Sequence, residues 1–163
     1  PTNIQSPPKV KLIEVKTADE MLLQTNKYNN KIDIAVFCAA IADFKIKKIN
    51  NKKIKKDTLT TLKLIKNIDI LKKISTQKTN RPKFVVGFSA ETDSKIIARK
   101  KLEEKNCNMI IYNKISKKNK VFGLDENKIS ILTKNKIVNY SKFSKLKCAN
   151  LIVDSIYKEI KNK

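Results

Sequence analysis

A run of small residues that ends in a carboxylate, followed by a group of lysines, is the part of the chain best suited to bind phosphate. The nearly continuous apolar run 32–40 predicts a buried central strand, and Ala39 to Asp43 stand where that strand ends. Small side chains there would let a ligand approach the backbone, and Lys53, Lys55 and Lys56 carry point charges suited to phosphate. Core alanines, a turn aspartate and a solvated lysine face explain the same residues. Spacing alone leaves both interpretations open.

A second group of candidates lies further along the chain. Lys101 and Lys105 are four residues apart, so a helix would project both side chains from one face, where they could grip a single polyanion. Phe88, next to Gly87 at the end of an apolar run, could stack on a base or belong to the core. Surface solvation of the two lysines is the plain alternative, and each signal is weak by itself.

Strands and helices alternate among the elements that must position these residues. Apolar spacing predicts strands over 10–15, 32–40, 59–65, 83–89 and 109–112, a hairpin over 129–132 and 137–140, and helices over 18–28, 68–76, 92–105 and 144–162. Asn67 is placed to cap the helix after it, with Asp69 in the first turn, where the helix dipole favours an acid. The order predicts an α/β, Rossmann-like three-layer domain with a mainly parallel central sheet and a C-terminal hairpin plus helix. Ligands bind such folds beyond the carboxyl ends of the strands.

Composition limits the chemistry that the chain can perform. It has no histidine, and Cys38, Cys107 and Cys148 lack the spacing of zinc ligands or of a redox pair, so free and mostly buried thiols are expected. Histidine-dependent nucleophiles and most metal clusters are therefore ruled out. No apolar run approaches the ~18–20 residues of a membrane helix, and the chain does not begin with a secretory signal. We therefore expect a cytoplasmic protein without a membrane partner.

The net charge of +22 would ordinarily indicate a nucleic-acid partner. Of the 37 basic residues, however, only Arg81 and Arg99 are arginines, and few aromatic residues are interleaved for base stacking. We therefore expect the lysines to form solvated surfaces, and we expect no specific nucleic-acid partner. A basic nucleic-acid-binding module remains the alternative function.

A glycine-rich turn after the first strand is usual in nucleotide-binding α/β domains, and this chain shows none. Its two glycines, Gly87 and Gly123, are in no such arrangement. Either the chain binds no nucleotide, or that turn lies upstream of Pro1. Because the chain also begins with Pro1 in place of methionine, we interpret residues 1–163 as one partial domain. This domain would lack its first strand and its glycine-containing turn.

Several short motifs occur in an order that resembles one enzyme family. They are the runs 39–44 (AAIADF), 53–56 (KIKK), 66–71 (KNIDIL) and 85–92 (VVGFSAET), continued by Asn113 and by the run 122–127 (FGLDEN). In this order they resemble the bacterial phosphopantothenate-cysteine ligase, which is the synthetase half of the bifunctional coenzyme A biosynthesis protein. The resemblance covers nearly the whole chain.

This resemblance implies a reaction and a set of site residues. CTP and 4'-phosphopantothenate would form an acyl-cytidylate with loss of pyrophosphate, and L-cysteine would then displace CMP to give 4'-phosphopantothenoylcysteine, with Mg2+ required. Lys53 falls on the family's catalytic lysine, in a mobile loop. The positions that match CTP-binding residues are Ala39, Ala40, Asp43, Lys53, Ile68, Asp69, Ile70, Leu71, Phe88, Lys101 and Lys105. The resemblance also implies a homodimer in which that loop can serve the neighbouring subunit.

The chain departs from the family pattern at a few positions. Ile68 stands where the family usually has proline, and Ser89 where it usually has alanine. The first strand, the glycine-containing turn and an asparagine motif that helps to bind the acyl intermediate should precede Pro1. The flavin-dependent decarboxylase half should lie further upstream, so no FMN is expected in this chain. A non-catalytic fragment that needs a partner chain therefore stays open as a third hypothesis.

Overall fold

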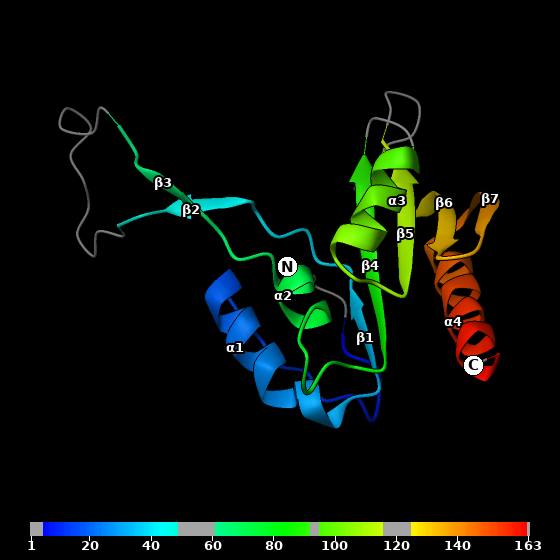
Figure 1. Cartoon of the computed structure of the whole chain (residues 1–163), viewed down its shortest axis with the longest axis horizontal. Coiled ribbons are helices and arrows are strands. Elements are labelled where there is room, and N and C mark those ends of the chain that lie inside the picture. The colour runs from blue at the N-terminus through cyan, green and yellow to red at the C-terminus, as the bar shows by residue number, and fades with distance from the viewer. Residues whose placement is uncertain (1–4, 49–60, 92–94, 116–124, 163) are drawn as a thin grey trace. The chain divides into compact units, whose positions relative to one another are not determined.

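The computed structural model describes residues 5–48, 61–91, 95–115 and 125–162, and the chain divides into two units (Figure 1). The first unit comprises Pro1–Tyr28 and Ile41–Ile70, and the second comprises Asn29–Ala40 and Leu71–Lys163. The boundary falls inside the short helix α2 (Ile70–Ser75). No helix in the described ranges is long and apolar enough to cross a membrane.

The second unit is built on a five-stranded sheet of order β1-β4-β5-β6-β7. Its strands are β1 (Ile34–Phe37), β4 (Phe84–Glu91), β5 (Met109–Lys114), β6 (Glu126–Thr133) and β7 (Ile137–Ser144). Strands β1, β4 and β5 are parallel, β6 is antiparallel to β5, and β7 is antiparallel to β6. This arrangement confirms the predicted Rossmann-like α/β fold with a parallel core and a C-terminal hairpin.

Helix α3 (Lys95–Glu104) covers one face of this sheet. Successive side chains of a strand point to opposite faces, so alternate residues of each strand share a face. Val85 and Ile110 lie on the face of α3, where they form a buried cluster with Ala98 and Leu102 of that helix. Burial of an aliphatic side chain of this size contributes about 1.5–3 kcal/mol, so this layer holds α3 in place.

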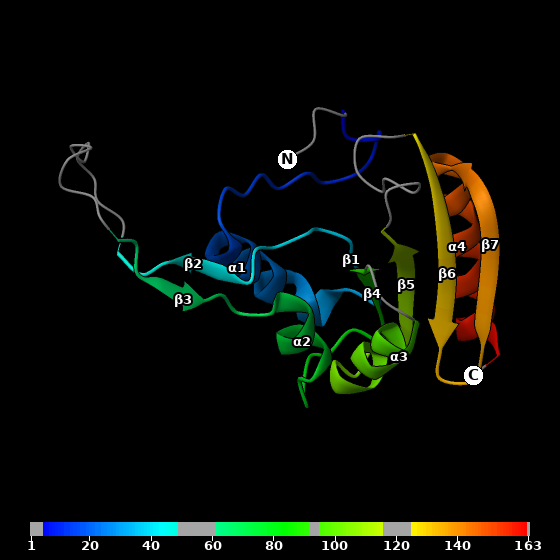
Figure 2. The same cartoon turned by 90° about the horizontal axis from the view of Figure 1, so that it is seen from above.

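Helix α4 (Lys145–Lys161) covers the other face, and Figure 2 shows it alongside β6 and β7. Its buried residues Cys148, Ile152 and Ile156 recur every fourth position and pack with Val86 and Ile111 of the sheet. The helix predicted over 144–162 is thus confirmed to within a residue at each end. The sheet and the two helices make up the three predicted layers.

The first turn of α4 shows why sequence predicted its start correctly. Ser144 lies just before the helix, and its Oγ accepts a hydrogen bond from the backbone N–H of Lys147 at 3.2 Å. This contact satisfies one of the N–H groups that a helix leaves without a partner, which is the usual role of serine at this position. At the other end, the N–H of Asn162 donates to the carbonyl of Lys158.

Strand β1 is shorter and more exposed than the run 32–40 predicted. It pairs with β4 alone among the described strands, and Ile34 and Val36 are 43% and 47% exposed while Ala35 is buried. The expectation of a central strand covered on both faces was therefore wrong. A continuous apolar run indicates burial on both faces, but it carries no information on which neighbours the strand has.

Arg81 joins the ends of several elements in the second unit. Its guanidinium donates to the carbonyl of Ser75 at the end of α2 (2.7 Å), of Pro82 (2.9 Å) and of Asn106 after α3 (2.8 Å). A fourth bond, to Oδ1 of Asn108, is 2.9 Å long. Arginine can serve so many acceptors because its planar group carries five N–H donors in fixed directions. This arginine is therefore structural and is not an exposed phosphate ligand.

The first unit contains helix α1 (Ala18–Tyr28) and an antiparallel ribbon of β2 (Phe44–Ile46) and β3 (Leu64–Lys66). The prediction of α1 is confirmed at both ends. Strand β2 was missed, because the segment after Asp43 was interpreted as a polar loop. The strand predicted over 10–15 was wrong: these residues form no strand, because alternation of apolar and polar residues does not supply a hydrogen-bonded neighbour.

All three cysteines are free thiols, as predicted. Cys107 and Cys148 are buried in the second unit and Cys38 is exposed. Burial raises the pKa of the Cys148 thiol, because removal from water disfavours the charged thiolate. The two buried thiols therefore act as small apolar residues of the core.

Candidate functional site

The carboxyl ends of the parallel strands β1, β4 and β5 meet at one edge of the sheet, which is where ligands bind in this class of fold. Strand β1 ends at Phe37, opposite Gly87, and Ala39 and Ala40 follow it as exposed residues. From Phe88 onward, β4 pairs with β5 alone among the described strands. On the side of β1, the last residues of β4 thus have no neighbouring strand among the described residues.

Gly87 allows α2 to approach β4 closely. A Cβ atom at this position would lie 2.6 Å from Cδ2 of Leu71 and 2.9 Å from Cδ1 of Ile110, and both distances are shorter than van der Waals contact. The side chain of Leu71 therefore packs against β4 in the core, so a bound nucleotide could contact only the backbone of this residue. The side chain of Ile70 is also buried, at 2% exposure, so the same holds for Ile70.

Phe88 is half-buried and packs against the cluster on the face of α4. Its neighbours Gly87 and Ser89 point to the opposite face, that of α3. The structure thus favours the core interpretation of the ring, while its role in CTP binding stays a prediction.

Lys101 and Lys105 lie one helical turn apart, as predicted. The N–H of Lys105 donates to the carbonyl of Lys101 at 3.0 Å, so the helical turn extends to Lys105, one residue beyond Glu104. The Nζ of Lys101 forms an ion pair with Oε1 of Glu91, the last residue of β4. Both side chains are partly buried, 34% exposed for the lysine and 23% for the glutamate. The sequence pattern did not predict this pairing.

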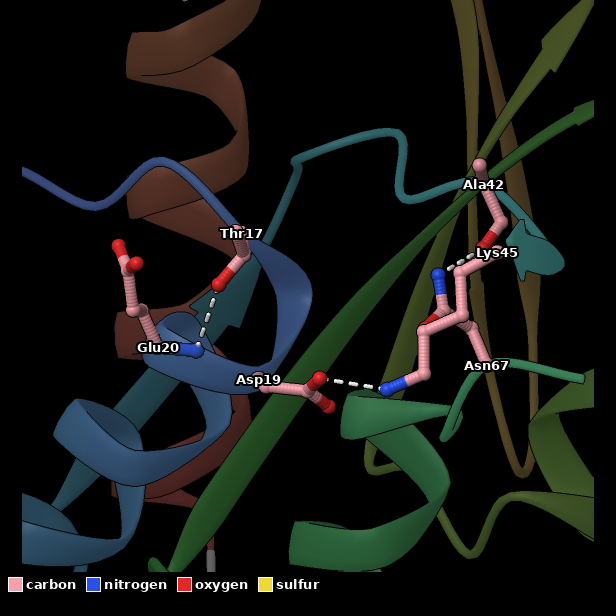
Figure 3. Close-up of polar contacts among 6 residues, drawn as sticks. All are labelled: Thr17, Asp19, Glu20, Ala42, Lys45 and Asn67. Carbon is pink, nitrogen blue, oxygen red and sulfur yellow. Dashed lines mark hydrogen bonds and ion pairs between the residues drawn. The ribbon is translucent and has the colours of Figure 1, made fainter. Parts of the chain in front are cut away.

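In the first unit, Asn67 joins the two strands of the ribbon (Figure 3). Its Nδ2 donates to the carbonyl of Ala42 at 2.8 Å, and its backbone N–H donates to the carbonyl of Asp43 at 2.8 Å. Asp43 itself is exposed at the start of β2, where its carboxylate can reach a ligand. The side-chain amide and the backbone N–H of Asn67 thus hold the carbonyl groups on both sides of Asp43.

The prediction that Asn67 caps a helix from residue 68 was wrong. Helix α2 begins at Ile70, so Asp69 precedes the helix, and Ile68 and Asp69 are both exposed. The side chain of Asn67 is already bonded to Ala42, a contact between residues far apart in sequence. Local spacing cannot reveal such a competing partner.

Helix α1 anchors β2 within the same unit. Oδ2 of Asp19 accepts from Nζ of Lys45 at 2.5 Å, and Oγ1 of Thr17 caps the helix by accepting from the N–H of Glu20 at 3.1 Å (Figure 3). Glu20 in turn accepts from the N–H of Lys16 at 2.7 Å. These backbone contacts lower the pKa of Glu20, because they stabilise its charged form.

The predicted lysines of the loop, Lys53, Lys55 and Lys56, lie outside the described residues. In the sequence they stand between β2 and β3, whose pairing brings Ile46 opposite Leu64. In the sequence, the predicted catalytic lysine therefore lies between the two strands of the ribbon.

Asn113 is a further polar residue near the carboxyl end of β5. It is 5% exposed, and its buried Oδ1 has no hydrogen-bond partner within the part of the chain that the structure describes. An unsatisfied buried oxygen costs about 1–3 kcal/mol, and the oxygens of Asn29, Asn67, Asn127 and Thr133 share this feature. Asn113 belongs to the motifs that carry the family resemblance, but its sequence context predicted no role for it. No metal-binding group of three or more acidic, cysteine or histidine side chains occurs among the described residues.

The predicted CTP-binding residues are divided between the two units. The first unit holds Asp43, Ile68, Asp69 and Ile70, and the second holds Ala39, Ala40, Leu71, Phe88, Lys101 and Lys105. Within the second unit, the alanines follow β1, and Phe88 lies in the second half of the neighbouring parallel strand β4. That all these residues line one pocket stays a prediction.

Curated relatives of this chain are coenzyme A biosynthesis bifunctional proteins. The CoaBC protein of Borreliella burgdorferi is 39% identical over 161 residues, which cover 96% of this chain and 40% of the relative. That of Haemophilus influenzae is 39% identical over 158 residues, covering 96% and 39%. The chain thus spans about 40% of the length of these relatives.

Solved structures agree with the sequence matches. The C-terminal domain of a CoaBC protein superposes with a TM-score of 0.80 at 25% identity, covering 100% of this chain and 72% of that domain. The DNA/pantothenate metabolism flavoprotein of Streptococcus pneumoniae has the same fold, with a TM-score of 0.71 at 17% identity, over 94% of this chain and 75% of that one. The family model of the DNA/pantothenate metabolism flavoprotein C-terminal domain matches residues 1–160. The chain therefore belongs to this family of C-terminal domains.

Proposed function

We propose that this protein acts in coenzyme A biosynthesis as a CTP-dependent phosphopantothenate-cysteine ligase. The observation that carries the proposal is the 39% identity to two CoaBC proteins over 96% of the chain. The superposition on the C-terminal domain of a CoaBC protein supports it, because the synthetase motifs of the sequence fall in that domain.

The proposed reaction has two steps. A carboxylate oxygen of 4'-phosphopantothenate attacks the α-phosphorus of CTP, and the bond to the departing pyrophosphate breaks. The amine of L-cysteine then attacks the acyl carbon of the acyl-cytidylate, CMP leaves, and the amine loses a proton as the amide forms. Negative charge builds up at the α-phosphate in the first step, so groups that stabilise this charge control its rate.

Three lysines supply that stabilisation in the proposal. Lys53 is the candidate that acts at the reacting phosphate, while Lys101 and Lys105 hold the triphosphate from one face of α3. The exposed alanines after β1 leave room for the nucleotide to approach the backbone. Because the side chains of Ile70 and Leu71 are buried, these two positions would contact CTP through main-chain atoms.

Magnesium belongs to the proposal as part of the nucleotide substrate. The described residues form no cluster of three or more metal-binding side chains, so we assign no protein ligand to the ion. Bound to the triphosphate, it would neutralise phosphate charge. The chain's own residues would then orient the nucleotide.

Pyrophosphate release tests the proposal directly. The chain should be assayed alone and as a chimaera that carries in front of Pro1 the preceding part of the C-terminal domain of the Borreliella burgdorferi relative. We expect pyrophosphate and CMP in equal amounts only when CTP, magnesium, 4'-phosphopantothenate and cysteine are all present. Absence of pyrophosphate from both forms would contradict the proposed function.

The catalytic lysine can be tested in the same assay. Replacement of Lys53 by glutamine removes its positive charge. We expect kcat to fall about 100-fold or more, because one contact that stabilises the transition state is lost. Lys63→Gln is the matched control, because it removes the same charge from an exposed residue next to β3. Equal rates for both variants would show that Lys53 is not catalytic.

A further inference from the structure

We propose that Glu91 is a positioning residue that holds the ammonium group of Lys101 in place for the triphosphate of the nucleotide. This inference rests on the proposed function, since it assigns Lys101 to phosphate binding. It follows from one contact within the second unit, the ion pair between Nζ of Lys101 and Oε1 of Glu91. Neither the spacing of these residues nor the family motif predicted that they meet.

Glu91 is held rigidly at the carboxyl end of β4. It is paired with Lys114 of β5, and its carbonyl accepts from the N–H of Ile115 at 2.8 Å. The hydroxyl of Ser89, two residues earlier on the same face, donates to Oε1 of Glu91 at 3.2 Å. Ser89 is only 2% exposed, so its own position is fixed by the core. The carboxylate is therefore a stationary acceptor at the predicted ligand-binding edge.

Lys101, in contrast, has a long flexible side chain on a well-anchored helix. Ala98 and Leu102, on either side of it, are buried against the sheet, so the start of the lysine side chain is fixed by packing. Its four-carbon stem would otherwise sample many rotamers, and ordering such a stem on binding reduces affinity. The pair with Glu91 orders the stem before any ligand arrives.

The pair also leaves the lysine able to bind phosphate. An ammonium group has three N–H donors, and the contact with Oε1 of Glu91 uses one of them, so within the described residues the pair leaves donors for phosphate oxygens. In the alternative mechanism, Glu91 would compete with phosphate for Lys101 and would have to release it before the nucleotide binds. Removal of the negative charge of Glu91 would then raise the affinity for the nucleotide, whereas the positioning role predicts that the affinity falls.

The kinetic test replaces Glu91 by glutamine in whichever form releases pyrophosphate in the assay above, the chain alone or the chimaera. This form is called the active form. We expect KM for CTP to rise about 2- to 10-fold, because the side chain of Lys101 is no longer ordered before CTP binds. The value of kcat should change less, because the reacting groups themselves are unaltered. In a Lys101→Met background the same substitution should have no further effect, which shows that Glu91 acts through Lys101. Glu104→Gln is the matched control, since it breaks the exposed Lys100–Glu104 pair on the same helix at 3.7 Å.

A second test needs no turnover. The rate at which an acylating reagent modifies Lys101 can be followed by mass spectrometry of the folded protein, with and without inorganic tripolyphosphate. We expect faster acylation of Lys101 in Glu91→Gln than in the wild type, and weaker protection by tripolyphosphate. The same measurement on Glu104→Gln should match the wild type at Lys101.

The outcomes separate this proposal from the proposed function. An unchanged acylation rate, or an unchanged or lowered KM for CTP in Glu91→Gln, would overturn the positioning role. Faster acylation and weaker tripolyphosphate protection in Glu91→Gln, in a protein that does not turn over CTP, would contradict the ligase function. The Glu91–Lys101 contact and its role in anion binding would then stand.

Discussion

Two apolar strands, β5 in the second unit and β3 in the first, differ sharply in their surroundings. Met109 to Tyr112 of β5 are at most 3% exposed, whereas Leu64 and Ile65 of β3 are 55% and 37% exposed. Strand β5 has a neighbour on each side and a helix on each face, while β3 has one neighbouring strand, β2. We therefore expect the five-stranded sheet to contribute most of the stability and the ribbon to contribute little. In the sequence, the predicted catalytic lysine lies between the two strands of the ribbon.

The largest expected effect is on the core of the sheet. Ile111→Ala removes a fully buried side chain between β5 and α4 and should lower the free energy of unfolding by about 2–5 kcal/mol. Leu64→Ala, the matched change on the ribbon, should alter it by no more than about 0.5 kcal/mol. Urea unfolding of both variants measures the difference. If the two substitutions lowered the free energy of unfolding equally, the five-stranded sheet would not contribute more to stability than the ribbon does.

Loss of the arginine that joins the helix ends should come next. Arg81→Ala removes the donor from the carbonyls of Pro82 and Asn106, while that of Ser75 keeps its bond from Nδ2 of Asn106, and the change should cost about 1.5–3 kcal/mol. Lys83→Ala, which breaks an exposed ion pair with Asp33, should remain close to the wild type. A cost for Arg81→Ala as small as that of Lys83→Ala, measured by urea unfolding, would show that this network is dispensable.

A smaller effect is expected in the ribbon itself. Asn67→Asp keeps the size of the side chain but removes the donor to Ala42, which should weaken the ribbon by about 0.5–1.5 kcal/mol. The amide of Lys47, which donates across the ribbon to Lys63, should then exchange its hydrogen faster, while the amides of β5 should not change. Faster exchange in both regions would mean that the two units do not respond separately.

The smallest effect concerns the pH dependence of α1. The folded pKa of Glu20 lies below its unfolded value, so its contribution to stability is present above the unfolded value of about 4.3. That contribution is lost as pH falls through the folded pKa. The difference in thermal stability of α1 between wild type and Glu20→Gln, followed by NMR, should therefore shrink below about pH 4. Glu14→Gln, an exposed change of equal charge, is the control.

Sequence patterns predicted the elements whose signals are local. Helix α1, helix α4 and the hairpin of β6 and β7 were all expected, because apolar spacing acts within a few residues. The parallel sheet followed from the alternation of strands and helices.

Features that depend on distant partners could not be predicted in this way. The exposed edge of β1, the missed strand β2 and the bond from Asn67 to Ala42 all depend on which segment lies alongside. Motif order identified Lys101 as a candidate, but its ion pair with Glu91 brings together a strand end and a helix that no local spacing links.

The central claim, that the chain makes an acyl-cytidylate from CTP, is tested most directly by a burst experiment without cysteine. The active form is mixed with CTP, magnesium and 4'-phosphopantothenate, and pyrophosphate is measured against the concentration of active sites. We expect a rapid release of about one pyrophosphate per site, followed by steady turnover only when cysteine is added. No burst without cysteine, together with pyrophosphate release that does not require 4'-phosphopantothenate, would contradict it.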